Sequence, residues 1–165
     1  MTRYFEDIRI GEQASLGHHR FTAEEIVSFA ERFDPQPFHL DEQAAAASHF
    51  GGLVASGWHT AAVWMRLMVS HWQRQIEAEA YAPGERRPRL GVSPGIRSLK
   101  WQTPVRVGDT ISYSTRVTGK EELTSRPQWG LVISRNEGVN QDGREVLTFL
   151  GQVFVERRTV AGQQA

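Results

Sequence analysis

The chain has 165 residues, of which 39% are hydrophobic and 23% are charged, a composition typical of one globular domain with a substantial core. Nineteen basic side chains balance nineteen acidic ones, so the sequence lacks the basic surplus that nucleic-acid-binding domains usually carry. Cysteine is absent, which excludes disulfides, cysteine-ligated zinc, iron–sulfur clusters and a thiol nucleophile.

The N-terminal segment contains no apolar run of the kind that a signal peptide needs. The most apolar stretch, residues 51–69, is interrupted by His59 and Arg66, so it does not predict a membrane span. We therefore expect a cytoplasmic protein. The adjacent histidines His18 and His19 are expected on a surface turn.

The first predicted helix begins with a capping box formed by Thr22 and Glu25. The apolar residues that follow have helical spacing, and we expect them on one buried face: Ile26, Phe29, Ala30 and Phe33. Pro35 ends this helix because the residue before a proline is disfavoured in the α conformation. Asp34 is therefore expected at the helix exit.

Two further helices are predicted before the middle of the chain. Asp41 can cap a short helix that runs to Ala47, and a Gly-Gly pair then breaks it. A longer helix is predicted from Ser56 to about Ala80. Its apolar residues lie nearly all round its first half, which predicts a helix buried on most sides: Trp58, Ala61, Ala62, Val63, Met65, Leu67, Met68, Val69 and Trp72.

A Pro- and Gly-rich linker over residues 81–94 separates this helical half from a strand-rich half. Alternating residues there predict antiparallel strands that share one covered face: Ile111, Tyr113, Thr115, Val117, Trp129, Leu131 and Ile133. Val107–Asp109 predicts a tight turn into a strand, and Asp142-Gly143 predicts a hairpin turn. The expected fold class is α+β, with one long buried helix wrapped by an antiparallel sheet.

The densest group of candidate catalytic residues lies between Asp34 and Asp41, where two prolines stiffen a predicted loop. An imidazole at His39 titrates near neutral pH, and the Asp34 carboxylate can orient it or share a proton transfer with it. The alternative is that Asp34 caps backbone amides and His39 packs in the core.

A second group lies at Ser56 and Gly57, where the long helix is expected to begin. The free amides at a helix N-terminus suit a developing oxyanion. The alternative is an N-cap serine followed by a packing glycine. The flanking residues do not fit the serine-hydrolase elbow, and the spacing of His49 and His59 does not fit a metal site, so we expect no bound metal.

The motif Asp34-x-Gln36-Pro37-x-His39-x-Asp41 resembles the hydratase-2 signature of MaoC-like dehydratases, a family that includes the (R)-specific enoyl-CoA hydratases. Three further segments resemble the family in the expected order, and matching features extend from about residue 4 to 155. These segments are Tyr4–Glu12, similar to an opening strand, Gly52–Gly57, similar to the entry of a central helix, and Pro104–Thr110, similar to a Pro-Val-x-x-Gly-Asp turn.

The resemblance implies a single MaoC-like domain over residues 1–165, with its core at about 4–157 and the hotdog fold, in which a curved antiparallel sheet wraps a central helix. It implies that Asp34 and His39 are the catalytic pair, and that Gly57, beside Ser56, binds the thioester oxygen. The family's usual asparagine is Gln36 here, and the histidine often found before the glycine is Ser56. These departures concern the substrate more than the reaction.

The expected function is the reversible addition of water to a trans-2-enoyl thioester of coenzyme A or of acyl carrier protein, with no cofactor except coenzyme A as part of the substrate. A homodimer or larger homo-oligomer is expected because an exposed sheet edge invites pairing. The alternatives are a hotdog thioesterase, a non-catalytic subunit that binds acyl thioesters, and a structural protein without a ligand. Hydration without release of free thiol would distinguish a hydratase from a thioesterase.

Overall fold

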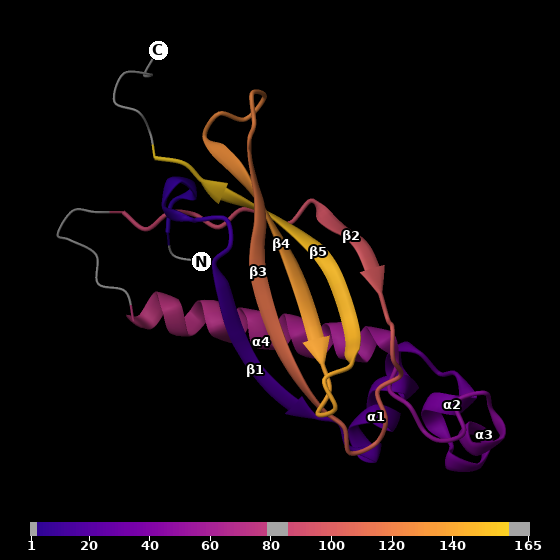
Figure 1. Ribbon diagram of the computed structural model, residues 1–165. Helices are drawn as coiled ribbons and strands as arrows, with labels where there is room; N and C mark the ends of the chain where they lie inside the picture. The colour runs from indigo at the N-terminus through magenta and orange to yellow at the C-terminus, as the bar shows by residue number, and fades with distance from the viewer. Residues whose placement is uncertain (1–2, 79–85, 159–165) are drawn as a thin grey trace.

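The computed structural model describes residues 3–78 and 86–158, in which one antiparallel sheet lies across one long helix (Figure 1). The sheet has five strands in the order β1-β3-β4-β5-β2. The strands are β1 (Gln13–Arg20), β2 (Gly95–Lys100), β3 (Thr110–Glu122), β4 (Trp129–Val139) and β5 (Glu145–Glu156). The expected α+β arrangement is confirmed.

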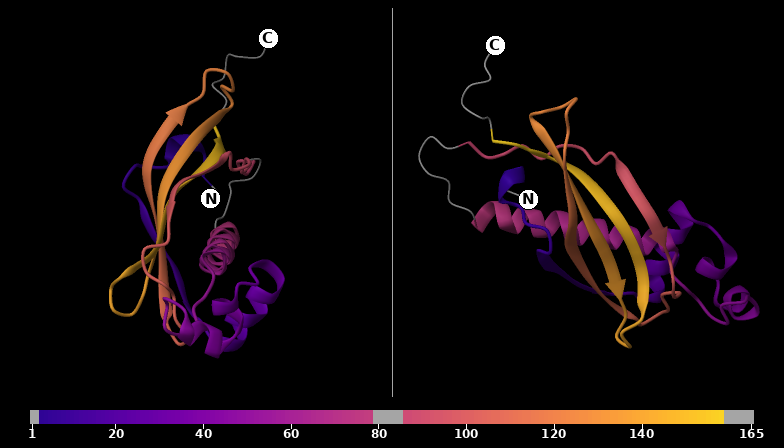
Figure 2. Two further views of the ribbon diagram at one scale, coloured as in Figure 1. Left: turned by 90° about the vertical axis from the view of Figure 1, so that its right-hand side faces the viewer. Right: turned by 45° about the horizontal axis from the view of Figure 1, so that its top comes forward.

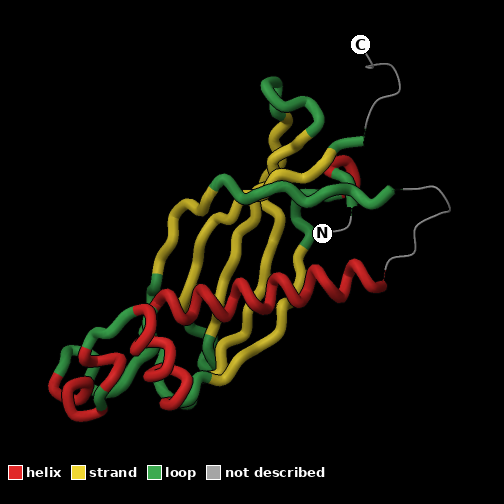
Figure 3. The backbone as a smooth tube through the Cα atoms, turned by 180° about the vertical axis from the view of Figure 1, so that it is seen from behind, coloured by secondary structure: helices red, strands yellow, loops and turns green. Residues whose placement is uncertain are grey.

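The long helix α4 (Gly57–Ala78) crosses one face of the sheet. The left view of Figure 2 shows the sheet close to edge-on, and Figure 3 shows it from the side of the helix. The other helices gather beside the N-terminal end of α4 (Figure 1). They are α1 (Ala23–Phe33), α2 (Pro37–Leu40) and α3 (Glu42–Ala47), and a short 3-10 helix, η1 (Phe5–Asp7), precedes β1. This arrangement places α1, α2 and the start of α4 around one end of the sheet.

Local sequence signals explain where α1 begins and ends. The Thr22 hydroxyl accepts a hydrogen bond from the Glu25 amide, as the capping box predicts, and Asp34 is the C-cap residue. Ile26 and Ala30 are fully buried, but Phe33 is 67% exposed, so its predicted burial is wrong. Phe33 lies in the last turn of α1, where no other element covers it.

Helix α4 is buried on the side that faces the sheet rather than on most sides as expected. Trp58, Met65 and Val69 are 56%, 51% and 38% exposed, and their spacing places them on one stripe of the helix. The apolar residues of α4 therefore form two faces. One packs in the core against the sheet, and the other is exposed to solvent among the described residues.

The predicted side-chain phase of β4 is wrong by one residue. Ser134 pairs with Val117 and Asn136 pairs with Thr115, so the even-numbered residues of β4 share the helix-facing side with the odd-numbered residues of β3. Ile133 therefore lies on the opposite face, because a shift of one residue moves every side chain of a strand to the other side. The Asp142-Gly143 turn between β4 and β5 is confirmed, with Gly143 at φ +78°.

Two predictions near the N-terminus are also wrong. The segment Tyr4–Glu12 does not form a strand, because Phe5–Asp7 is a 3-10 helix and the first strand begins at Gln13. The histidines His18 and His19 belong to β1 and pair with β3 instead of lying on a turn. The first part of the predicted linker falls outside the described residues.

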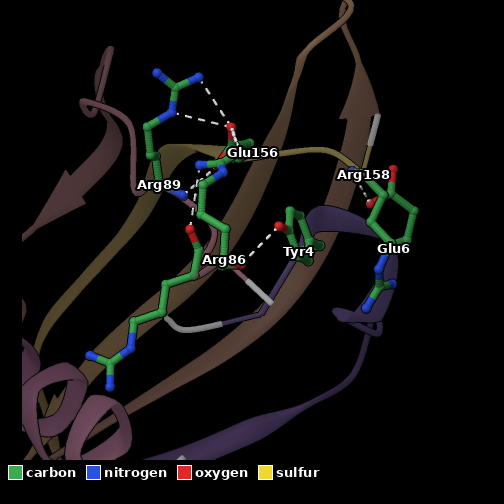
Figure 4. A network of polar contacts seen from close by, with 7 residues as sticks. Tyr4, Glu6, Arg86, Arg89, Glu156 and Arg158 are labelled. Carbon is green, nitrogen blue, oxygen red and sulfur yellow. Dashed lines mark hydrogen bonds and ion pairs between the residues drawn. The ribbon is translucent and has the colours of Figure 1, made fainter. Parts of the chain in front are cut away.

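A network of arginines around Glu156 fixes the end of the sheet away from α1 (Figure 4). Glu156, the last residue of β5, is 4% exposed, and Arg86 donates to its carboxylate at 2.7 Å. The Arg89 amide donates to the same carboxylate at 2.6 Å, and the Tyr4 hydroxyl donates to the Arg86 carbonyl. These bonds join the segment before β2 to the N-terminus and to β5.

Candidate active site

The structure brings Asp34 and His39 together, as the motif predicts. Asp34 follows the last residue of α1, and Pro37 begins the single turn of α2, which carries His39 back toward α1. The expected loop thus contains a short helix. His39 Nε2 lies 3.4 Å from Asp34 Oδ2, so the two groups are close enough to share a proton or a bound water.

The orientation of the His39 ring is set by its other nitrogen. His39 is buried, and its Nδ1 lies 2.7 Å from the carbonyl oxygen of Val54. A carbonyl oxygen only accepts hydrogen bonds, so Nδ1 carries the proton and donates it. This hydrogen bond leaves Nε2 as the ring nitrogen that faces Asp34.

The Asp34 carboxylate is held by uncharged donors at both of its oxygens. The Ser56 hydroxyl donates to Oδ2 at 2.6 Å, and the Gln36 side-chain amide donates to Oδ1 at 2.8 Å. Partial burial raises the pKa of Asp34, but these two hydrogen bonds and the nearby His39 ring outweigh it and lower the pKa below its ordinary value. Asp34 is therefore held as a carboxylate.

The first turn of α4 begins beside this pair. Ser56 caps the helix, because its Oγ accepts a hydrogen bond from the Trp58 amide at 3.2 Å. Gly57 is then the first helical residue, whose amide has no partner within the helix. Among residues 3–78 and 86–158, no acceptor meets this amide. Gly57 supplies the kind of free donor that the sequence predicts.

Trp101 covers Gly57 and was not found by sequence reasoning. Its indole Nε1 donates to the Gly57 carbonyl at 2.9 Å. A Cβ atom at position 57 would lie 2.5 Å from the Trp101 ring, so only glycine fits there with the ring in place. No local pattern identifies Trp101, because it follows β2 and lies 44 residues from its partner.

These groups line one cavity of about 450 Å³. Asp34, His39, Ser56 and Gly57 all contribute to its wall, so the four predicted site residues are brought together. Most of the remaining wall is aromatic or aliphatic: Phe38, Phe50, Val54, Trp58, Trp101, Pro104, Val105 and Val146. The cavity therefore combines a few convergent polar groups with an apolar wall, as sites for small organic ligands commonly do.

The other histidines do not join this site. His59 is buried and stacks on Phe29 at 4.5 Å between ring centroids, and desolvation lowers its pKa to about 4. Within the described part of the chain, no three side chains of the metal-ligating types are grouped to hold a metal ion. No helix among the described residues is long and apolar enough to cross a membrane.

Comparison with known sequences gives consistent matches. Residues 9–132 match the family described as the MaoC like domain. An (R)-specific enoyl-CoA hydratase from Rhodospirillum rubrum is 32% identical over 117 residues, which cover 70% of each chain. A 3-hydroxybutyryl-CoA dehydratase from Methylorubrum extorquens is 27% identical over 145 residues, which cover 87% of this chain and 82% of that protein.

Comparison with solved structures supports the fold. A MaoC-like dehydratase from Rhodospirillum rubrum matches with a TM-score of 0.78 and 38% identity, over 96% of this chain and 99% of the other. A Mycobacterium tuberculosis protein described as a double hotdog fold matches with a TM-score of 0.73 and 18% identity, over 99% of this chain and 46% of that one. The expected hotdog fold is confirmed.

Proposed function

The chain belongs to the family of MaoC-like domains, and we propose that it is an acyl-thioester hydratase/dehydratase acting on a trans-2-enoyl-CoA or its 3-hydroxyacyl counterpart. One observation carries the proposal: a carboxylate and an imidazole nitrogen lie 3.4 Å apart in a cavity that Gly57, the first residue of α4, also lines. Asp34 and His39 are the proposed catalytic residues, and Gly57 is the proposed oxyanion donor.

Hydration requires one water molecule to be divided between two neighbouring carbons. The water oxygen forms a bond to the β-carbon while one O–H bond breaks, and a proton is delivered to the α-carbon. Asp34 Oδ2 and His39 Nε2 lie close enough to contact the same water from one side of the cavity, so that water would lose a proton to one of them, and the pair would return a proton to the same face of the substrate. The charge of the pair is the same before and after the reaction.

The thioester oxygen gains negative charge while water adds, because an enolate-like species precedes protonation of the α-carbon. The Gly57 amide at the positive end of α4 is suited to bind this oxygen. The proposed role of Ser56 in substrate binding is limited to the cavity wall, because its hydroxyl proton is already donated to Asp34.

A thioesterase would share the cavity but would need water to attack the thioester carbon, with release of free thiol. The spacing of Asp34 and His39, which matches the hydratase signature, favours hydration. A non-catalytic subunit or a structural protein without a ligand has no need for a buried imidazole whose free nitrogen faces a carboxylate.

The test is to incubate the protein with trans-2-enoyl-CoA esters of several chain lengths. Absorbance of the conjugated thioester and free thiol are followed in the same sample. Loss of absorbance without thiol release supports the proposal, whereas equal loss of absorbance and gain of thiol identify a thioesterase. No change with any chain length refutes both enzymatic readings.

A homodimer is also proposed, and the open apolar face of α4 supports it. Trp58, Met65 and Val69 lie on that face, and Ile96 and Trp101 are half-exposed in and just after the edge strand β2. A second copy could cover both the stripe and the strand edge.

Sedimentation at micromolar concentration is expected to show that the wild type is a dimer. Met65→Arg is expected to dissociate this dimer. A wild type that is monomeric and fully active would refute the assembly.

A further inference from the structure

Ser56 makes two hydrogen bonds that together use its hydroxyl group. The side chain is 1% exposed; Oγ donates to Asp34 Oδ2 at 2.6 Å and accepts from the Trp58 amide at 3.2 Å. A hydroxyl has one proton to donate. That proton is directed at the proposed catalytic carboxylate and not at the cavity.

This arrangement connects the N-terminus of α4 to the catalytic pair. The Trp58 amide polarises the Ser56 hydroxyl, and the hydroxyl stabilises the Asp34 carboxylate. The oxygen that Ser56 holds, Oδ2, is also the one that faces His39 Nε2. Because Gln36 holds the other oxygen, the plane of the carboxylate is fixed from both sides.

Few charged groups act on this carboxylate. His39 from α2 is the one charged or titratable group that influences Asp34 within the described residues; Gln36 and Ser56 are uncharged. The protonation state of Asp34 therefore depends mainly on burial, on two neutral donors and on one imidazole. Removing a single neutral donor should have a measurable effect.

We propose that Ser56 is a positioning residue that holds Asp34 as a carboxylate oriented toward His39 Nε2. Its catalytic consequence rests on the proposed hydratase function. This role is additional to the helix cap that Ser56 forms, because a cap by itself would stabilise α4 without affecting Asp34. It also differs from an oxyanion donor, which would contact the substrate.

The first test is a carboxyl ¹³C NMR titration of protein labelled at aspartate. The chain has five aspartates, so the Asp34 signal can be identified by its loss in Asp34→Asn. Ser56→Gly removes the hydroxyl and retains most of the capping preference, whereas Ser56→Ala removes both. In each variant we expect the titration of Asp34 to move to higher pH than in the wild type, and Ser56→Thr should restore it.

An Asp34 titration that is unchanged in Ser56→Gly and Ser56→Ala overturns the inference. This measurement needs no turnover, so it separates failure of this inference from failure of the proposed function. Kinetics provide the second test: kcat for enoyl-CoA hydration should fall about tenfold in Ser56→Gly, with KM little changed, as for loss of one hydrogen bond to a charged group. If Ser56→Ala loses both thermal stability and activity while Ser56→Gly keeps full activity, Ser56 acts as a helix cap and not as a positioning residue for Asp34.

Discussion

Two buried or partly buried carboxylates, Asp34 and Glu156, lie at opposite ends of the sheet and are held in different ways. Glu156 is bound by two arginines, Arg86 and Arg89, and hydrogen bonds from Arg86 lower its pKa to about 2. Asp34 is bound by the neutral donors Ser56 and Gln36 and faces an imidazole nitrogen across a cavity.

We interpret this difference as that between a structural carboxylate, Glu156, and the proposed catalytic carboxylate, Asp34. Full positive charges lower the pKa of Glu156 well below its ordinary value, and the described residues that bind its carboxylate are arginines. Neutral donors orient Asp34, and no described arginine or lysine separates its carboxylate from His39 Nε2, which lies 3.4 Å away. The kind of partner, rather than the degree of burial, therefore distinguishes the two sites.

The largest expected effect is on catalysis at the Asp34 end. Asp34→Asn and His39→Ala should each lower kcat/KM for enoyl-CoA hydration by about a thousandfold, because each removes a group needed for proton transfer. Circular dichroism and the unfolding midpoint should stay close to those of the wild type. Retention of most activity in either variant would assign both residues to packing and capping.

A smaller effect is expected from loss of the Gly57 amide. Alanine is not a neutral substitution here, because its methyl group would meet the Trp101 ring, so both variants are made in a Trp101→Ala background. Gly57→Pro removes the donor and is tolerated at the first position of a helix. It should hydrate about a hundredfold more slowly than Gly57→Ala; equal rates would exclude the amide as the oxyanion donor.

The Glu156 end should respond in stability and not in activity. Glu156→Gln removes the charge that two arginines share, and the free energy of unfolding in urea should fall by about 2 kcal/mol. Glu145→Gln is a matched control, since Glu145 and its partner Arg135 are both 44% exposed and such a pair contributes less than about 1 kcal/mol. A large loss of hydration in Glu156→Gln would contradict the separation of the two ends.

The stability difference at Glu156 should also depend on pH. The pKa of Glu156 in the folded protein is about 2, below its ordinary value of 4.5, so ionised Glu156 stabilises the fold above about pH 4.5. This contribution is lost as the pH falls from about 4.5 toward 2. Urea unfolding of wild type and Glu156→Gln should therefore converge in that interval, and a constant difference would show that charge is not the cause.

Much of the candidate site follows from short-range signals in the sequence. The capping box at Thr22 and the proline after Asp34 set the length of α1, and Pro37 begins the turn that returns His39 toward Asp34. The start of α4 at Gly57 follows from its cap. These features could be predicted because each depends on residues fewer than six positions apart.

The features that were missed depend on long-range contacts. The Ser56 bond to Asp34 joins residues 22 apart, and Trp101 meets Gly57 from the end of an edge strand. The phase of β4 was misjudged because polar Ser134 and Asn136 occupy positions on the helix-facing side, so apolar alternation pointed to the wrong face. The helix α4 decides which side of β4 is buried, and the sequence of β4 alone does not reveal the position of α4.

Asp34 and His39 are proposed to act as one catalytic unit. The most direct test is the double variant Asp34→Asn/His39→Ala, measured with both single variants by hydration of the same enoyl-CoA. We expect the double variant to be about as slow as the slower single variant, because removing either group disables the pair. A rate equal to the product of the two separate losses would contradict it.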